Sequence, residues 1–131
     1  MRLALLIAAA LMMSAAVVAQ DAPTEQQAMR AKLASAMRLL AEERYPSLLE
    51  LLVAPSEIER LKAEGRWERA QEKFRLQKTQ TMHWLLSSML RGSTEIEIQE
   101  DGRRALFRLS RSGQRLATMT KEDGQWYLDN N

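Results

Sequence analysis

The sequence contains no cysteine and only one histidine in its 131 residues. The absence of cysteine excludes disulfide bonds, thiolate metal ligands, a cysteine nucleophile and a lipid anchor on cysteine. No carboxylate lies three or four positions from His83, so a conventional metal site has no support. We therefore expect no metal or other cofactor, and a fold that depends on the packing of its core.

A large excess of charge of one sign is also lacking. The chain has 19 basic and 17 acidic residues, a formal net charge of +2. Proteins that bind nucleic acids rely on clustered positive charge, so this balance argues against a nucleic-acid partner. The sequence has no glycine-rich phosphate loop, no serine-elbow motif and no internal repeat, so these common signatures of enzymes and repeat proteins are missing.

One uninterrupted apolar run opens the chain. A single positive charge precedes residues 3–13, which are apolar, and residues 14–19 are small or aliphatic. This order is typical of a secretory signal peptide, and the run is shorter than the about 20 residues that a membrane helix needs. We expect residues 1–19 to be removed after Ala19. Residues 20–131 then form a single periplasmic or secreted domain without an integral membrane span.

The first part of the expected domain has helical periodicity. Thr24 is a good N-terminal cap, and Gln27 can close a capping box with it. An apolar stripe follows at intervals of three and four residues, formed by Met29, Leu33, Ala36, Met37 and Leu40. The spacing predicts one helix of about 18 residues from Thr24.

Two prolines divide the next segment. Pro46 ends the first helix and can begin a second over residues 47–53, and Pro55 begins a short third helix that stops at Gly65. A long apolar line then predicts a single helix over residues 67–90.

The period of the sequence changes at Ser93. Apolar and charged residues alternate over residues 94–99, and Asp101-Gly102 favours a two-residue hairpin turn. This turn sets the register Ile98–Ala105, Ile96–Phe107 and Glu95–Arg108. A three-residue loop at 111–113 places Phe107 opposite Ala117 and Ala105 opposite Met119, a better match than a two-residue turn. A third turn at Asp123-Gly124 places Met119 opposite Leu128.

The result is a four-stranded antiparallel meander with one apolar face. Its predicted members are Ile96, Ile98, Ala105, Phe107, Leu109, Ala117, Met119, Trp126 and Leu128. Helices followed by strands, without alternation, indicate an α+β fold with N-terminal helices packed on the C-terminal meander. The long helix over 67–90 is the expected cover of the sheet, with Trp84 packing against Trp126.

The chain resembles a known superfamily at two segments. These are Tyr45-Pro46-Ser47-Leu48-Leu49, followed by Pro55, and the last strand Asp123-Gly124-Gln125-Trp126-Tyr127-Leu128. Both are similar to small exported members of the cone-shaped superfamily named after nuclear transport factor two. The resemblance implies a curved sheet that wraps a helix and leaves a pocket, used by some members for catalysis and by others for binding or dimerisation. This sequence has no convincing early hairpin, where many members place one, which implies a reduced cone.

Five large aromatic residues are the candidates for lining a small-molecule pocket. They are Tyr45, Trp67, Trp84, Phe107 and Trp126. The alternative is that they form the core or an interface, as such residues commonly do.

A run of arginines without an acidic residue lies between positions 103 and 115. Its members are Arg103, Arg104, Arg108, Arg111 and Arg115. They can bind an anionic surface or an acidic partner. The alternative, which we favour, is a solvated sheet face partly neutralised by Glu95 and Glu100.

The remaining candidates favour structural roles. His83 is the first suspect for acid–base chemistry, but the sequence identifies no partner for it. Glu95 and Glu97 alternate with Ile96 and Ile98, so they point away from the apolar side. Five methionines could bind Cu(I), yet they suit a role as core filler better: Met29, Met37, Met82, Met89 and Met119.

These observations leave three functional hypotheses. The first is an exported, non-enzymatic module that binds an unknown small apolar ligand or a protein partner, with a possible homodimer through the sheet. The second is a small-pocket isomerase or hydrolase that uses His83 or Tyr45. The third is an envelope-associated protein that binds an anionic surface through the arginine run.

Overall fold

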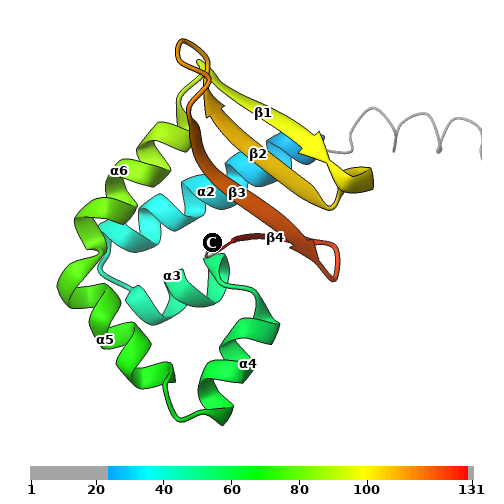
Figure 1. The fold of residues 1–131 in the computed structure, drawn as a ribbon. Helices are drawn as coiled ribbons and strands as arrows, with labels where there is room; N and C mark the ends of the chain where they lie inside the picture. The colour runs from blue at the N-terminus through cyan, green and yellow to red at the C-terminus, as the bar shows by residue number, and fades with distance from the viewer. Residues whose placement is uncertain (1–23, 130–131) are drawn as a thin grey trace, which may run out of the picture.

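The structure, a computed structural model, describes residues 24–129. The expected signal peptide lies outside these residues. Five helices precede four strands, which confirms the α+β class (Figure 1). The helices are α2 (Glu25–Ala41), α3 (Tyr45–Leu52), α4 (Pro55–Ala63), α5 (Trp67–Gln77) and α6 (Thr79–Leu90). The strands are β1 (Thr94–Gln99), β2 (Arg104–Leu109), β3 (Arg115–Glu122) and β4 (Gln125–Leu128).

Helix α2 begins with the predicted capping box. The Gln27 backbone N–H donates to Thr24 Oγ1 at 3.1 Å, and the Thr24 N–H donates to Gln27 Oε1 at 2.9 Å. These bonds satisfy backbone donors that the first turn of a helix leaves without partners. Four residues of the predicted stripe are buried: Met29, Leu33, Ala36 and Leu40.

The predicted single helix over residues 67–90 is wrong in one respect. The chain bends at Lys78 (φ −121°, ψ 0°), which separates α5 from α6. Lys78 takes part in a hydrogen bond on each side of the bend, because its N–H donates to Phe74 O and its carbonyl oxygen accepts from the Met82 N–H, both at 2.9 Å. The two halves have different neighbours. Phe74 of α5 packs edge-on against Tyr45 of α3, whereas α6 packs along α2 and the sheet.

The four strands form an antiparallel sheet in the order β1-β2-β3-β4, with the predicted register. Asp101 and Gly102 both have positive φ, and the Arg103 N–H donates to Glu100 O at 3.2 Å, as a tight hairpin turn requires. A bulge between Phe107 and Arg108 shifts the register at the far end of β2. Strand β1 is an edge, and no strand within residues 24–129 pairs with its outer side.

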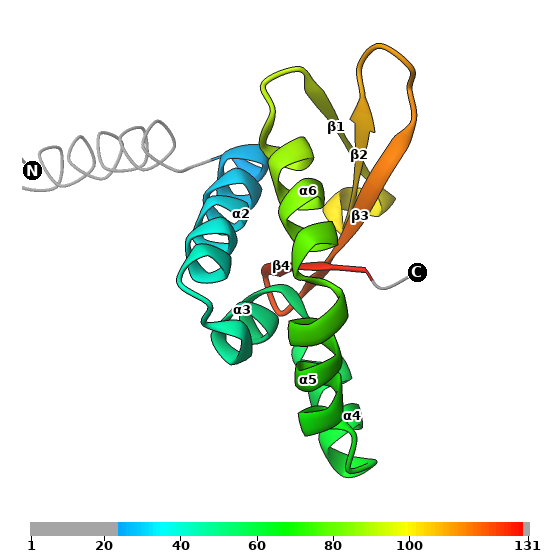
Figure 2. The same ribbon diagram turned by 90° about the vertical axis from the view of Figure 1, so that its left-hand side faces the viewer.

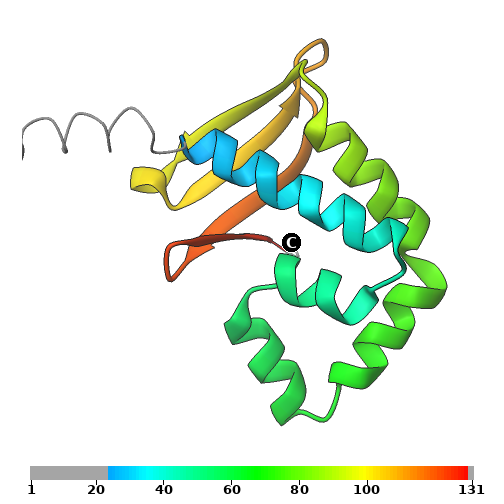
Figure 3. The ribbon, with the colours of Figure 1, turned by 180° about the vertical axis from the view of Figure 1, so that it is seen from behind.

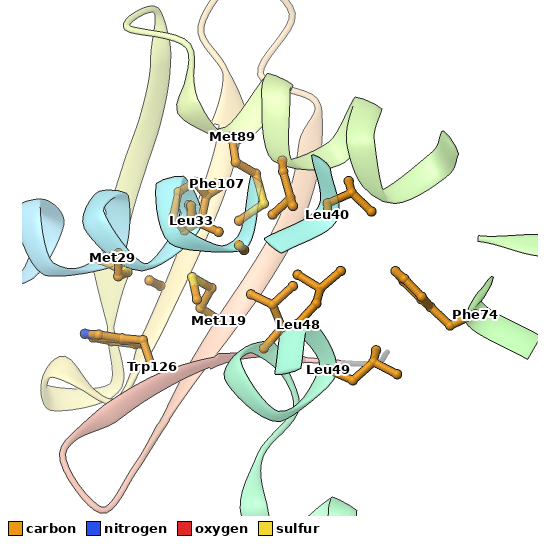
Figure 4. Close-up of a cluster of buried hydrophobic side chains, with 14 residues drawn as sticks. Met29, Leu33, Leu40, Leu48, Leu49, Phe74, Met89, Phe107, Met119 and Trp126 are labelled. Atoms are coloured by element: carbon orange, nitrogen blue, oxygen red, sulfur yellow. The ribbon is translucent and has the colours of Figure 1, made fainter. Parts of the chain in front are cut away.

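One face of the sheet packs on helices. Figure 2 shows α6 and α2 beside the sheet, and Figure 3 shows α2 running across it from behind. The sheet therefore has two covering helices rather than the single long one that we expected. The close-up in Figure 4 shows Met29 and Leu33 of α2 beside Phe107, Met119 and Trp126 of the sheet, and all five are at most 3% exposed.

Helices α4 and α5 extend away from the sheet (Figures 1 and 3). The start of α4 is tied to the end of β3 by Glu122, which accepts hydrogen bonds from the Ser56 N–H at 3.1 Å and the Ser56 hydroxyl at 2.9 Å. A carboxylate at this position also suits the positive end of a helix. The other end of α4 stops at Gly65, whose φ of +68° favours glycine.

Candidate functional site

A groove of about 430 Å³ lies at the helical end of the molecule. Helices α3, α4 and α5 provide most of its walls, Met82 of α6 and Leu128 of β4 complete them, and this volume is typical of small-molecule sites. Its apolar lining consists of Leu49, Leu52, Val53, Leu61, Trp67, Ala70, Phe74, Met82 and Leu128. We call it the helical groove.

The charged lining of the helical groove is mostly positive. It comprises Arg60, Arg66, Arg69, Lys73 and Lys78, with Glu57 as the acidic member. Glu57 pairs with Arg60 on the next turn of α4, and this hydrogen bond holds the pKa of the Glu57 carboxyl below its ordinary value. Arg60 also pairs with Glu64 at 3.0 Å, and Arg66 pairs with Glu64 at 3.1 Å.

The five predicted pocket aromatics do not line a common cavity. Only Trp67 lines the helical groove, where Lys62 lies 5.9 Å above its ring. Tyr45 is half-buried, with its ring centroid 5.9 Å from that of Phe74. Phe107 is fully buried in the core.

The predicted contact between Trp84 and Trp126 is wrong. Trp84 lies on the outer side of α6 and is 56% exposed, whereas Trp126 is buried against α2. The Trp126 indole N–H donates to Glu25 Oε2 at 2.6 Å. The apolar line that we predicted along residues 67–90 crosses the bend at Lys78. Trp67 and Trp84 therefore do not lie on one continuous helical face.

A second hollow, of about 390 Å³, follows α2 beside Trp126. At its edge Lys121 Nζ lies 2.7 Å from Glu25 Oε1. This bond, followed by that from the Trp126 indole, lowers the pKa of Glu25. The arrangement connects the first turn of α2 to strands β3 and β4, so we regard it as structural.

Lys32 lies on the wall of this second hollow. Its Nζ donates to the carbonyl oxygen of Trp126 and lies 3.8 Å from the centroid of the Tyr127 ring. Burial lowers its pKa to about 8, because removal of water penalises the ammonium form. No carboxylate among residues 24–129 forms a salt bridge with Lys32.

The predicted arginines follow the sheet and its turns. Arg108 Nε lies 3.7 Å from Glu97 Oε2, and Arg104 NH1 lies 3.7 Å from Glu100 Oε1. These two arginines flank Leu106, which is only 7% exposed although it points away from the helices. Their aliphatic stems can shield it from water, a structural role. The other three predicted arginines, Arg103, Arg111 and Arg115, are exposed.

A third hollow, of about 590 Å³, lies beside β1. Its charged lining consists of two bases, Arg30 and Arg108, and two acids, Glu95 and Glu97. Opposite charges of equal number give this surface no preference for an anion or a cation.

His83, the first candidate for acid–base chemistry, is exposed on α6 and lines none of these three hollows. Within residues 24–129 no group of three or more His, Asp or Glu side chains is placed to hold a metal ion. Three of the five methionines, Met29, Met89 and Met119, are fully buried in the core, which is the filler role that the sequence favoured.

The cations of the helical groove were missed in the sequence. Arg69 and Lys73 are four residues apart on α5, a spacing that places two side chains on one helical face. This four-residue spacing can be read from the sequence, but an acidic residue directly precedes each of these two cations in the chain. Only the structure separates the two sets, since Glu68 and Glu72 do not line the groove.

No helix within residues 24–129 combines the length and the apolar character required to cross a bilayer. Comparisons of the chain with protein families, with curated proteins and with solved structures find no match.

Proposed function

We propose that this chain is an exported, non-enzymatic binding protein that holds a small ligand in the helical groove. The observation that carries the proposal is the groove itself, about 430 Å³ in volume with walls of apolar side chains from three helices. Ligand sites are concave and mostly apolar, with a few polar groups that orient the ligand. Export rests on the signal-peptide pattern of residues 1–19.

The chemistry of the lining favours binding over catalysis. The groove combines aliphatic and aromatic side chains with arginine and lysine, and its acid, Glu57, is held by Arg60. A hydrolase or isomerase needs a nucleophile or a base within hydrogen-bond reach of the substrate. His83 and Tyr45, the residues of the enzyme hypothesis, are not among the groove's lining residues.

The proposal does not depend on the resemblance to the cone-shaped superfamily, which stays a prediction. That resemblance implies a pocket between a sheet and a helix. The helical groove instead lies between helices α3, α4 and α5, and only Leu128 reaches it from the sheet.

A neutral, apolar fluorescent dye tests the proposal. N-phenyl-1-naphthylamine is titrated into residues 20–131, and we expect saturable binding with one site per chain. Ala70 lines the groove, so Ala70→Phe fills part of it and should weaken binding at least about tenfold, the equivalent of 1.4 kcal/mol.

The matched control is Ala34→Phe, because Ala34 is exposed on α2 and does not line the groove. This variant should bind the dye as the wild type does. Thermal unfolding of both variants shows whether they fold. Absence of saturable binding by a folded wild type, or equal binding by the two variants, would contradict the proposal.

A further inference from the structure

The positive charge of the helical groove indicates which ligands it selects. Five of its lining residues are cations and one is an acid, although the whole chain carries only +2. Two of the cations, Arg60 and Arg66, are occupied by Glu57 and Glu64. The remaining three are Arg69, Lys73 and Lys78.

These three cations have no salt-bridge partner among residues 24–129. Arg69 and Lys73 lie one turn apart on the same face of α5, and Lys78 stands at the bend that follows. The neighbouring acid Glu72 is bound by Arg75 and does not line the groove. The positive charge along this wall is therefore available to a ligand.

We propose that the helical groove selects single-chain amphiphiles with an anionic head, whose apolar chain lies against α3 and whose head contacts Arg69, Lys73 and Lys78. The inference rests on the proposed function and names its ligand class. An apolar molecule without charge would leave these three cations without a partner. A small hydrophilic anion would leave the aliphatic walls exposed to water.

The size of the groove favours a small amphiphile over a protein partner. A volume of about 430 Å³ is near the lower end of the range for ligand pockets, about 300–1,000 Å³. A stable protein interface generally buries more than about 1,000 Å² of surface in total. One acyl chain with its head suits the groove better than a folded partner does.

The expected selectivity is moderate, because the cations are exposed. Exposed ion pairs are individually weak, so we expect Arg69, Lys73 and Lys78 together to favour an anionic over a neutral head by about tenfold at low salt. The advantage should shrink as salt increases, because the screening length falls from about 30 Å at 0.01 M to about 10 Å at 0.1 M.

The test compares three ligands with the same ten-carbon chain. Decanoate and decylammonium, each below its critical micelle concentration, and decan-1-ol, below its solubility limit, compete with N-phenyl-1-naphthylamine for the protein at 0.01 M salt. Decanoate should bind about tenfold more tightly than decan-1-ol, and decylammonium more weakly than both. The double variant Arg69→Gln/Lys73→Gln, which keeps Lys78, should reduce the preference for decanoate over decan-1-ol to about twofold.

The matched control is Arg103→Gln/Arg111→Gln, which removes two exposed cations outside the groove. It should keep the preference for decanoate, and thermal unfolding verifies that both double variants fold. Loss of the preference in this control would point to the overall charge of the chain and overturn the inference.

The remaining outcomes separate the two proposals. Dye binding with equal affinities for the three ten-carbon ligands overturns the anion selectivity and leaves the binding function intact. Absence of binding of the dye and of all three ligands overturns the binding function. Co-sedimentation with phosphatidylglycerol vesicles, or binding of a glutamate-rich peptide, without binding of decanoate monomers overturns the inference in favour of a membrane or a protein partner.

Discussion

Lys32 gives the protein a stability that increases with pH over a defined range. Burial lowers its pKa from 10.5 to about 8 in the folded protein. Between these two values the unfolded chain binds more protons than the folded one, so the free energy of unfolding rises with pH. Below pH 8 both states are protonated, and the folded state carries the full cost of the partly buried ammonium.

The size of the effect follows from the shift. A fully buried group would change stability by about 1.4 kcal/mol for each pKa unit. Lys32 is only half-buried, and its ammonium is attracted to the Tyr127 ring 3.8 Å away. Both factors reduce the expected gain to about 1–2 kcal/mol between pH 8 and 10.5.

Lys32→Met removes the titrating group and keeps an unbranched side chain. We expect the free energy of unfolding of the wild type to rise by about 1–2 kcal/mol relative to this variant across that range, in urea titrations followed by circular dichroism. Lys73→Met, which alters an exposed lysine, is the control and should differ from the wild type by a constant amount. A constant or falling difference for Lys32→Met would refute the desolvation argument.

Three further predictions concern the packing and the ends of helices. Phe107→Ala should lower the free energy of unfolding by about 3–5 kcal/mol in urea titrations, because Phe107 is fully buried. Glu122→Ala removes both hydrogen bonds to Ser56, so amide hydrogen exchange in α4 should accelerate with a loss of about 1 kcal/mol. Since Lys121 lowers the pKa of Glu25, Glu25→Gln should be less stable than the wild type above pH 4.5 and lose that difference at lower pH.

The sheet could be predicted from the sequence almost residue by residue. Its register depends on local information, because Asp101-Gly102 fixes the first turn and the alternation of Ile96 and Ile98 with glutamates indicates the apolar side, although Ile98 is 37% exposed. A shift by one residue would expose Phe107 and turn its neighbour Arg108 toward the core, so the correct register is strongly favoured.

The bend at Lys78 and the helical groove could not be predicted in the same way. Neither glycine nor proline lies near the bend, so the sequence carries no local signal for it. Its cause is tertiary, since Phe74 packs on α3 while Met89 packs in the core beside α2 and the sheet. The groove depends on how α4 and α5 leave the sheet, which periodicity along one helix does not specify.

The open edge of β1 constrains how two copies of this chain can associate. If two β1 strands paired antiparallel in one continuous sheet, the two-fold axis would place side chains of the same face opposite each other. In the two registers that pair most of the strand, Glu97 of one copy would then lie opposite Glu95 or Glu97 of the other. Like charges directly opposite destabilise a strand pair. The two acids thus disfavour the pairing of two β1 edges, and a strand with basic side chains opposite them would pair there more favourably.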